Sequence, residues 1–411
     1  MLKRNSVNAA VMTAPGRFEV RQYPYPDVDD FSAVIELEMC GICGTDKHTF
    51  RGETVQFAGT PAESHTPFPI IPGHEIVGRV AEIGRSAEKN LEYTGAPLKV
   101  GDRVVMCPDI LCGKCWYCRN TFGFPLCEKI RGYGNAFCCD EAPNLMGGWA
   151  DYIYVRRDAF VFKVPEDMSV EIAVMAELMG VTYNLDKAKE FYTMGGEGFG
   201  SGATVVIQGV GPMGLMHLFK AHILGAGQII ALDRSDLRLQ FAKDFGADHT
   251  ISVTRTTQAE RLTAIRDLTQ GRGADVIVEC TGVAEAVPEG LEMARRGGTY
   301  VVAGVYADVG DIRINPHRHF LANQIRLIGM TNHPPTGYPN SLRLLNRFKT
   351  RLPLTKFVTH SYPVNEIDQA MAAAFDIDHA MKVVVTPSRR ARPNEERAPA
   401  LRPQGEGAPG N

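Results

Sequence analysis

The sequence contains no uninterrupted apolar stretch that approaches the ~18 residues needed for a membrane-spanning helix. Its N-terminus, MLKRNSVNAAVMTAPG, has two basic residues but no apolar run of signal-peptide length. Neither sign of charge is in excess, because 44 basic residues face 47 acidic ones and the formal net charge is -3. We therefore expect a cytoplasmic protein that binds neither nucleic acid nor a membrane.

The chain has no evident internal repeat, but the pattern of its apolar segments changes along its length. From about residue 7 to 178, short apolar runs such as AVIELEMCG and EIVGRVAEIG alternate with Gly and Pro, which predicts an antiparallel, barrel-like β domain. From about residue 180, strand-like segments such as ATVVIQGV and QIIALD alternate with helix-like ones, which predicts a doubly wound parallel sheet with helices on both faces. The 411 residues, 44% of them hydrophobic, can fill two such domains.

Four of the ten cysteines lie in one short segment, CGKCWYCRNTFGFPLC, as Cys112, Cys115, Cys118 and Cys127. This C-x2-C-x2-C-x8-C spacing can place four thiolates at the corners of a zinc tetrahedron. With every position filled by sulfur, such a site would be structural, without an open position for a substrate. Two disulfides and an iron–sulfur cluster are the alternatives, of which the expected compartment disfavours the first.

A dinucleotide-binding motif occurs where the predicted parallel sheet begins. In VVIQGVGPMGLM, Gly209, Gly211 and Gly214 form G-x-G-x-x-G between a strand and a helix, the context in which the helix N-terminus faces a pyrophosphate. The next strand ends in Asp233, 24 residues after Gly209, where a carboxylate can accept hydrogen bonds from ribose hydroxyls. NAD is therefore favoured over NADP, although the adjacent Arg234 could accommodate a phosphate.

A second group of metal-binding residue types lies in GICGTDKH and PGHEIVGRVAEIG. Cys43 and His74 are residue types that bind zinc, and Glu75 could add an oxygen ligand. Two or three protein ligands leave a position open, and zinc with an open position can polarise an alcohol oxygen and lower its pKa. A lone Cys or His is more often an ordinary core residue, but here both accompany a dinucleotide-binding motif.

Together these motifs, in this order, resemble the zinc-containing alcohol dehydrogenases of the medium-chain dehydrogenase/reductase family over about residues 7–387. The resemblance implies an α/β fold that combines a GroES-like β-barrel catalytic domain with a Rossmann domain. It places the first part of the catalytic domain at 1–179, with a structural zinc lobe at 107–130. The Rossmann domain would occupy 180–328, the catalytic domain would resume at 329–387, and the Pro- and charge-rich residues 388–411 would form a disordered tail.

The resemblance also implies roles for individual residues. Cys43 and His74 match the first two ligands of the catalytic zinc, and Glu75 matches an acid that binds this zinc or exchanges onto it. Many members supply a further cysteine ligand at the position where this chain has Glu177. A glutamate there is similar to the polyol and sorbitol dehydrogenase-like branch, in which it lies at or near the metal, so a direct Glu177–zinc bond is left open. An acidic residue at a helix start is the structural alternative for Glu177. The four-cysteine loop matches the structural zinc lobe.

Two further residues match the family's proton path. Thr45 matches the hydroxyl that contacts the substrate oxygen, and His48 matches the histidine that passes the proton to solvent, a role suited to imidazole. His48 could instead be an ordinary surface histidine. Asp46 is expected to support a zinc ligand from behind.

The predicted function is hydride transfer between a secondary alcohol or polyol and NAD, with one catalytic and one structural zinc per chain. Alternatives are a zinc-independent quinone or alkene reductase on the same fold and a non-catalytic dinucleotide-binding zinc protein. The expected partners are a small alcohol or ketone and further copies of the chain, in a homodimer or homotetramer paired through TYVVAGV or IRLIGM. Evidence on the substrate conflicts, because Phe50, Phe57 and Phe68 suggest an apolar pocket whereas Glu177 suggests a polyol.

Overall fold

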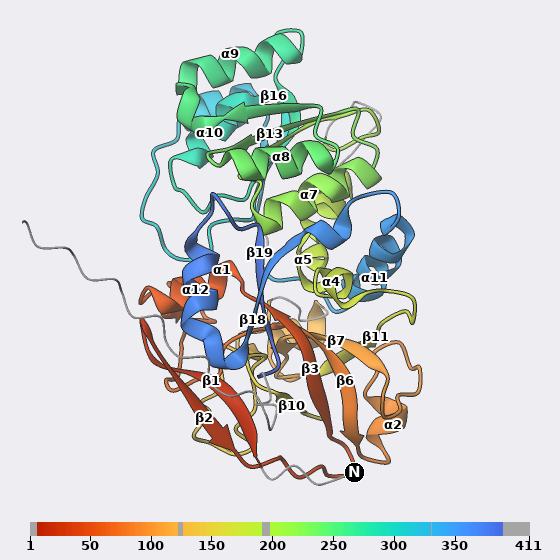
Figure 1. Cartoon of the computed structure of the whole chain (residues 1–411). Coiled ribbons are helices and arrows are strands. Elements are labelled where there is room, and N and C mark those ends of the chain that lie inside the picture. Colours follow the sequence, from red (N-terminus) through yellow and green to blue (C-terminus); the bar gives the residue numbers. More distant parts are fainter. Residues whose placement is uncertain (1–5, 122–125, 191–197, 330, 389–411) are drawn as a thin grey trace, which may run out of the picture.

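The structure is a computed structural model that describes residues 6–121, 126–190, 198–329 and 331–388 (Figure 1). Two sheets dominate it, one in each half of the molecule. The tail predicted at 388–411 lies outside the described residues except for Ser388. Within the described part of the chain, each helix is too short or too polar to span a bilayer.

The first sheet is largely antiparallel and contains seven strands, in the order β11-β7-β6-β3-β19-β18 with β10 also paired to β3. Its strands are β3 (Ala33–Gly41), β6 (Glu75–Ile83), β7 (Arg103–Cys107), β10 (Tyr152–Val155), β11 (Phe160–Lys163), β18 (Val358–Pro363) and β19 (Lys382–Thr386). The last strand, β19, pairs antiparallel with β3, so the C-terminal segment returns to the sheet of the N-terminal strands. Figure 1 shows this return in blue beside the red and orange strands.

Shorter elements surround this sheet and build the loops that reach the cleft. The two-stranded pairs are β1 (Val7–Ala14) with β2 (Arg17–Tyr23), β4 (Val55–Gln56) with β5 (Ser64–His65), and β8 (Asp109–Ile110) with β9 (Arg131–Gly132). The helices are α1 (Gly44–Phe50), α2 (Ala87–Asn90), α3 (Trp116–Asn120), α4 (Val170–Ala173), α11 (Gly337–Phe348) and α12 (Ile367–Phe375), and short 3-10 turns lie at Leu354–Lys356 and Val364–Glu366.

The second sheet has six parallel strands in the order β14-β13-β12-β15-β16-β17. They are β12 (Thr204–Gln208), β13 (Gln228–Asp233), β14 (His249–Ser252), β15 (Ala274–Glu279), β16 (Ala294–Val302) and β17 (Arg326–Gly329). If the six strands are numbered along the chain, their order in the sheet is 3-2-1-4-5-6. Successive strands are therefore added toward one edge from β12 to β14 and toward the other edge from β15 onward, which makes the gap between β12 and β15 a topological switch point. Ligands bind at such a switch point in open parallel sheets.

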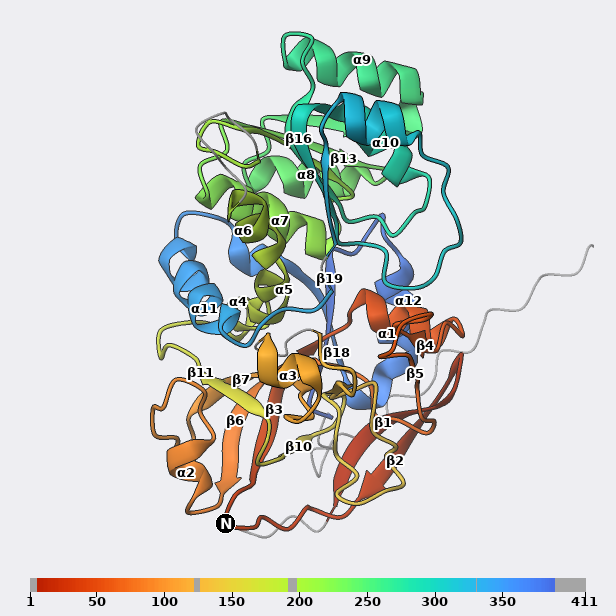
Figure 2. The same cartoon turned by 180° about the vertical axis from the view of Figure 1, so that it is seen from behind.

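Helices cover both faces of the parallel sheet, as Figures 1 and 2 show. They are α6 (Tyr183–Glu190), α7 (Pro212–Ile223), α8 (Asp236–Asp244), α9 (Gln258–Leu268) and α10 (Ala286–Met293), with a 3-10 turn at Val253–Arg255 and a π-helical turn at His317–Ala322. Helix α5 (Ala176–Val181) packs between α7 and α11, where the two halves of the molecule meet. Helices α7 and α8 pack on one face, and α9 and α10 pack on the other. The predicted α/β fold, a barrel-like β domain with a doubly wound parallel sheet, is confirmed.

The strand TYVVAGV, predicted as a possible site of pairing between copies of the chain, largely coincides with β16. This strand lies between β15 and β17, so both of its edges are already hydrogen-bonded and that expectation is wrong. The other candidate, IRLIGM, contains β17, the last strand of the sheet. Leu327 of this edge strand is 49% exposed.

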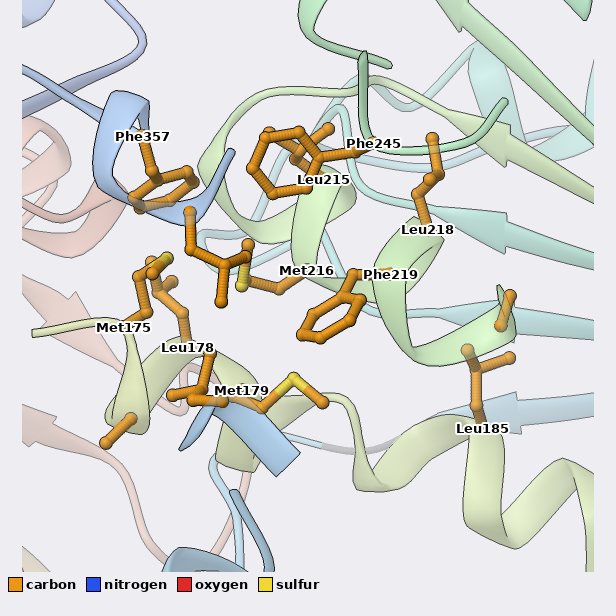
Figure 3. Packing of buried hydrophobic residues seen from close by; sticks show 14 of the residues in the cluster. Met175, Leu178, Met179, Leu185, Leu215, Met216, Leu218, Phe219, Phe245 and Phe357 are labelled. Carbon is orange, nitrogen blue, oxygen red and sulfur yellow. The ribbon is translucent and has the colours of Figure 1, made fainter. Parts of the chain in front are cut away.

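One hydrophobic core joins the two halves of the molecule. It contains Met39 and Val77 from the first sheet together with side chains from α5, α7 and the parallel sheet. Figure 3 shows Met175, Leu178 and Met179 lying against Met216 and Phe219 of α7. Because this core is continuous, the two walls of the cleft between the sheets are held in a fixed relation.

Replacing Phe219 with alanine should destabilise this joint core. Phe219 is fully buried and its ring contacts Phe348 edge-on, with centroids 5.5 Å apart. Deleting a buried phenylalanine ring typically costs about 3–5 kcal/mol, so the melting temperature should fall by several degrees. Leu321→Ala, which removes a side chain that is 73% exposed, is the control and should leave the melting temperature nearly unchanged. Equal shifts in the two variants, measured by calorimetry, would contradict this account.

Candidate active site

A cavity of about 750 Å³ lies between the two sheets and is lined by residues from both. The first half contributes Cys43, Thr45, His48, His74, Glu75 and Glu177. The parallel sheet contributes loops at the carboxyl ends of its strands, including Gly211 after β12, Cys280 after β15 and Tyr306 after β16. The cavity therefore opens at the switch point between β12 and β15.

The cavity contains a compact group of metal-binding side chains, Cys43, His74 and Glu75, whose ligand atoms all lie within 4.8 Å of one another. Cys43 is the N-cap of α1, where the Asp46 carboxylate accepts a hydrogen bond from its backbone N–H at 2.8 Å. His74 Nδ1 is buried, has no hydrogen-bond partner within the described ranges, and lies 3.9 Å from Asp46 Oδ1. A thiol, an imidazole and a carboxylate at this spacing fit zinc.

The glycine before His74 fixes the direction from which the imidazole enters the cavity. Gly73 has φ +90°, and a Cβ at this position would lie 2.3 Å from the indole of Trp149. Trp149 is fully buried, so it cannot make room for a larger residue. The chain therefore turns tightly at Gly73 and places His74 and Glu75 at the start of β6.

Glu75 forms an ion pair with Lys382, the first residue of β19, inside the protein. Lys382 Nζ lies 2.6 Å from Glu75 Oε1 and also donates to the carbonyl oxygen of Ile42 at 3.0 Å. Both side chains are almost completely buried. Burial opposes the charge, but the Glu75 carboxylate keeps the pKa of Lys382 above its ordinary value. Glu75 is thus held by a cation as well as lying beside the zinc-type donors.

Glu177 lies on the cavity wall but outside the compact donor group. Its Oε1 is 3.1 Å from Nε2 of His333, and its Oε2 is buried without a hydrogen-bond partner in the described part of the chain. His333 lowers the pKa of Glu177 against the effect of burial. The carboxylate is therefore anchored on one side and has an acceptor oxygen available on the other.

Thr45 and His48 follow Cys43 on α1 and also line the cavity. His48 Nδ1 lies 2.5 Å from Glu53 Oε2, and its side chain is 26% exposed, so the ring connects the cavity with solvent. The ring of Tyr306 lies against that of His48, with centroids 5.5 Å apart. The His48 ring thus lies between the cavity and the exposed Glu53.

The four cysteines of the predicted zinc loop form the second donor group found within the described residues. The Sγ atoms of Cys112 and Cys118 are 3.9 Å apart, and none of the ten cysteines is in a disulfide, which removes the disulfide alternative. Backbone N–H groups of Lys114 and Cys115 lower the pKa of Cys112 to about 6. Four thiols with backbone N–H donors fit a tetrahedral zinc site with no open position.

The glycine motif lies directly after β12 and begins α7. Gly209 has φ +82°, and a Cβ at Gly214 would lie 1.8 Å from the carbonyl oxygen of Gly209. The turn therefore tolerates no side chain at Gly214, and the N-terminus of α7 lies open at the cavity through Gly211. A turn of this shape before a twelve-residue helix fits the pyrophosphate of a dinucleotide.

Asp233 and Arg234 at the end of β13 differ in their surroundings. Asp233 is buried and accepts hydrogen bonds from the backbone N–H groups of Val210 at 2.8 Å and Ser235 at 2.9 Å. Arg234 is exposed and does not line the cavity, whereas Arg238, one turn along α8, does. A Cβ at Gly211 would lie 3.2 Å from Arg238 Nη1, so this guanidinium is the cation beside the glycine turn.

Several cavity residues were not predicted from the sequence. Lys382, Arg238, Asp109 and Tyr306 line the cavity, and His333 contacts the wall residue Glu177. A lysine at the start of the apolar run KVVV was a usable signal for Lys382, because a buried lysine requires a partner. The others carry no local signal.

Two family descriptions match the two halves of this architecture. Residues 29–166 match "Alcohol dehydrogenase GroES-like domain", and residues 212–347 match "Zinc-binding dehydrogenase". The first range contains Cys43, His74 and the four-cysteine loop, and the second contains most of the helices and strands of the parallel sheet.

Individual relatives cover nearly the whole chain. A 5-exo-hydroxycamphor dehydrogenase from Pseudomonas putida is 32% identical over 88% of this chain and 94% of its own length. A sorbitol dehydrogenase from Bacillus subtilis is 30% identical over 93% and 98%. An erythritol/L-threitol dehydrogenase from Mycolicibacterium smegmatis is 27% identical over 93% and 98%.

Solved structures agree with these relatives. An alcohol dehydrogenase from Thermotoga maritima superimposes with a TM-score of 0.83 at 32% identity, covering 93% of this chain and all of that one. The alcohol dehydrogenase of Thermus sp. ATN1 gives a TM-score of 0.74 at 27% identity, over 92% and 99%. The zinc-independent reductase is therefore not favoured, and zinc and a nicotinamide dinucleotide are the cofactors. This chain belongs to the zinc-containing alcohol dehydrogenases of the medium-chain dehydrogenase/reductase family, in the polyol dehydrogenase-like branch, and is an oxidoreductase that acts on alcohol groups.

Proposed function

We propose that this protein oxidises a secondary hydroxyl of a polyol, or reduces the matching ketone, with NAD as hydride acceptor and one catalytic zinc. The observation that carries the proposal is the donor group Cys43, His74 and Glu75 in the same cavity as the glycine turn. Glu177 stands where many family members have a cysteine, and its free Oε2 lies in reach of the cavity.

Zinc held by these donors supplies a Lewis acid, and the nicotinamide ring supplies the hydride acceptor. The chain's own residues bind and orient the substrate and remove its proton. Thr45 accepts the proton of the reacting hydroxyl, and His48, paired with Glu53, transfers it to solvent. The buried Asp46 fixes the N-terminus of α1 and lies behind His74.

The composition of the cavity wall supports a polyol. Of the three phenylalanines considered from the sequence, Phe57 lines the cavity, whereas Phe50 stacks on Phe18 in the hydrophobic core and Phe68 is not part of the wall described. The same wall contains the polar side chains Gln56, Asp109, Asn135, Thr331 and Asn332. The sorbitol and erythritol/L-threitol dehydrogenases among the relatives are named for such substrates.

Substituting Cys43 tests the catalytic zinc site. Cys43→Ser should lower the zinc content of protein purified without added metal from two ions per chain to one. Loss of several kcal/mol of Lewis-acid stabilisation should lower kcat/KM for xylitol about 10³-fold or more. Cys138→Ser, a cysteine outside both donor groups, is the matched control and should retain two zinc ions and full activity. Two zinc ions and normal turnover in Cys43→Ser would contradict the assignment.

The four-cysteine loop should bind a zinc ion that stabilises but does not catalyse. Cys115→Ser should also lower the zinc content to one ion, but it should lower the melting temperature while largely preserving kcat/KM at 25 °C. Metal analysis, calorimetry and steady-state kinetics on the same samples separate this pattern from that of Cys43→Ser. Activity lost in proportion to zinc in Cys115→Ser would contradict a purely structural role.

The buried Asp233 supports NAD over NADP, because a carboxylate at this position repels a 2'-phosphate. Asp233→Ser should lower kcat/KM for NAD by about 10-fold or more, which corresponds to the loss of a hydrogen bond to a charged group. It should lower kcat/KM for NADP less. The ratio of kcat/KM for the two cofactors is the measurement. A wild-type preference for NADP that Arg234→Ala abolishes would contradict this proposal.

Domain boundaries and assembly stay predictions. The entry of β18 and β19 into the first sheet supports a catalytic domain made of residues 1–179 and 329–387 around a Rossmann domain at 180–328. The edge position of β17, with Leu327 exposed, supports a homodimer or homotetramer in which two parallel sheets meet at this strand.

A further inference from the structure

Asp109 is a carboxylate on the cavity wall that the chemistry described above does not use. It begins β8, immediately after Pro108 and the fully buried Cys107 at the end of β7. In the β8–β9 ladder it lies opposite Gly132, which also lines the cavity. His74 and Glu177 are close enough to influence its charge, so Asp109 belongs to the zinc end of the cavity.

The protein compensates this carboxylate incompletely. Asp109 is 7% exposed, and among the described residues a single side chain donates to it, the neutral amide Nδ2 of Asn332 at 3.0 Å from Oδ2. No lysine or arginine of the described chain lies within ion-pair distance of it. Burial raises the pKa of Asp109 to about 6, against the opposing effect of His333 and His74. A buried carboxylate with one neutral donor is costly unless a ligand completes its hydrogen bonds.

A second acceptor lies beside it. Asn135 Oδ1 is buried and has no hydrogen-bond partner among the residues that the structure describes. The Asn135 amide sits over Gly132, because a Cβ at Gly132 would lie 2.5 Å from Asn135 Oδ1. Since Gly132 is the ladder partner of Asp109, the absence of a side chain there brings the two polar groups onto one patch of the wall.

The chemistry of this patch points to a ligand rich in hydroxyl groups. Asp109, with a single neutral donor on Oδ2, and Asn135 Oδ1 present acceptor capacity that is not filled among the described residues, and an O–H group is a donor that fits it. A simple alcohol has one hydroxyl, which would be taken up by zinc held at Cys43, His74 and Glu75 and by Thr45. A second hydroxyl is required to reach the patch.

We propose that Asp109, supported by Asn135 and Asn332, binds a hydroxyl on a carbon neighbouring the reacting carbinol and thereby selects vicinal diols and polyols over alcohols with one hydroxyl. This inference rests on the proposed dehydrogenase function and deepens it. Asp109 is the specificity-determining residue, Asn332 orients its carboxylate, and Asn135 completes the acceptor pair.

The test uses 2-butanol and 2,3-butanediol, which differ by one neighbouring hydroxyl. With NAD and zinc-loaded full-length protein, kcat/KM is measured for both alcohols in the wild type, Asp109→Ala and Asp109→Asn. Asp109→Ala should lower kcat/KM for the diol by about 10- to 100-fold, because the site loses a hydrogen bond to a charged acceptor, and should change the value for 2-butanol by less than about threefold. Asp109→Asn, which retains an acceptor oxygen, should lie between.

Asp102→Asn is the control for loss of a buried aspartate outside the cavity. Asp102 pairs with Lys163 at 2.9 Å and accepts from the backbone of Lys99, so its substitution should lower stability without changing the diol-to-alcohol ratio. An equal loss for both alcohols in Asp109→Ala would assign Asp109 a merely structural role and overturn the proposal. A wild type that oxidises 2-butanol as well as the diol would also overturn it, while leaving the dehydrogenase function intact.

Binding separates the two proposals further. If the wild type oxidises neither alcohol, the proposed function fails, but saturation-transfer NMR still compares binding of the two alcohols to the wild type and to Asp109→Ala. Stronger binding of 2,3-butanediol that disappears in Asp109→Ala supports the hydroxyl site independently of turnover. Equal binding of both alcohols to both proteins overturns it.

Discussion

The ion pair between Glu75 and Lys382 is the interaction on which the active site depends. The two residues are 307 positions apart, and Lys382 also donates to Ile42, the residue before Cys43. One ammonium group therefore contacts the immediate neighbours of both Cys43 and His74. Either charge alone in this interior would be strongly destabilising, so the pair forms only when β19 has entered the first sheet. The return of the C-terminal segment is thus a requirement of the site.

Glycine residues, which leave space for neighbouring groups, shape the cavity as much as the donor side chains do. A Cβ at Gly41 would lie 1.9 Å from Glu75 Oε2, so the buried ion pair occupies space that only glycine leaves. Gly41 is also the ladder partner of Glu75 on β6 and of Val384 on β19, which makes it the point where three strands meet. The glycine turn after β12 follows the same rule, since Gly214 allows the start of α7 to approach the carbonyl of Gly209. Close approach of backbone, rather than attraction alone, sets these positions.

The fold and the motif residues could be predicted because their signals are local. The change from strand-rich to alternating texture, the cysteine spacing and the glycine motif each lie within a short stretch of chain. What the sequence did not reveal depends on packing at a distance. TYVVAGV does not reveal by itself whether its strand lies at an edge, and only the complete strand order shows that β16 is interior. Arg234 adjoins Asp233 in sequence, but the helical turn of α8 directs Arg238, not Arg234, to the cavity. Asp109 and Asn332 are 223 residues apart, so no spacing rule joins them.

The cavity is electrostatically divided, although the chain as a whole is nearly neutral. Arg238 lies beside the glycine turn, and burial together with Arg238 lowers the pKa of the cavity residue Lys47 to about 8. Such crowded cations favour an anion between them, as a dinucleotide provides. Elsewhere on the cavity wall, Asp109 and Asn135 present acceptors that an anion would avoid and that hydroxyl donors satisfy. Cys43, His74 and Glu75 line the same cavity, so a cation beside the glycine turn and acceptors beside the zinc-type donors give the anionic cofactor and a hydroxyl-rich substrate different complementary surfaces.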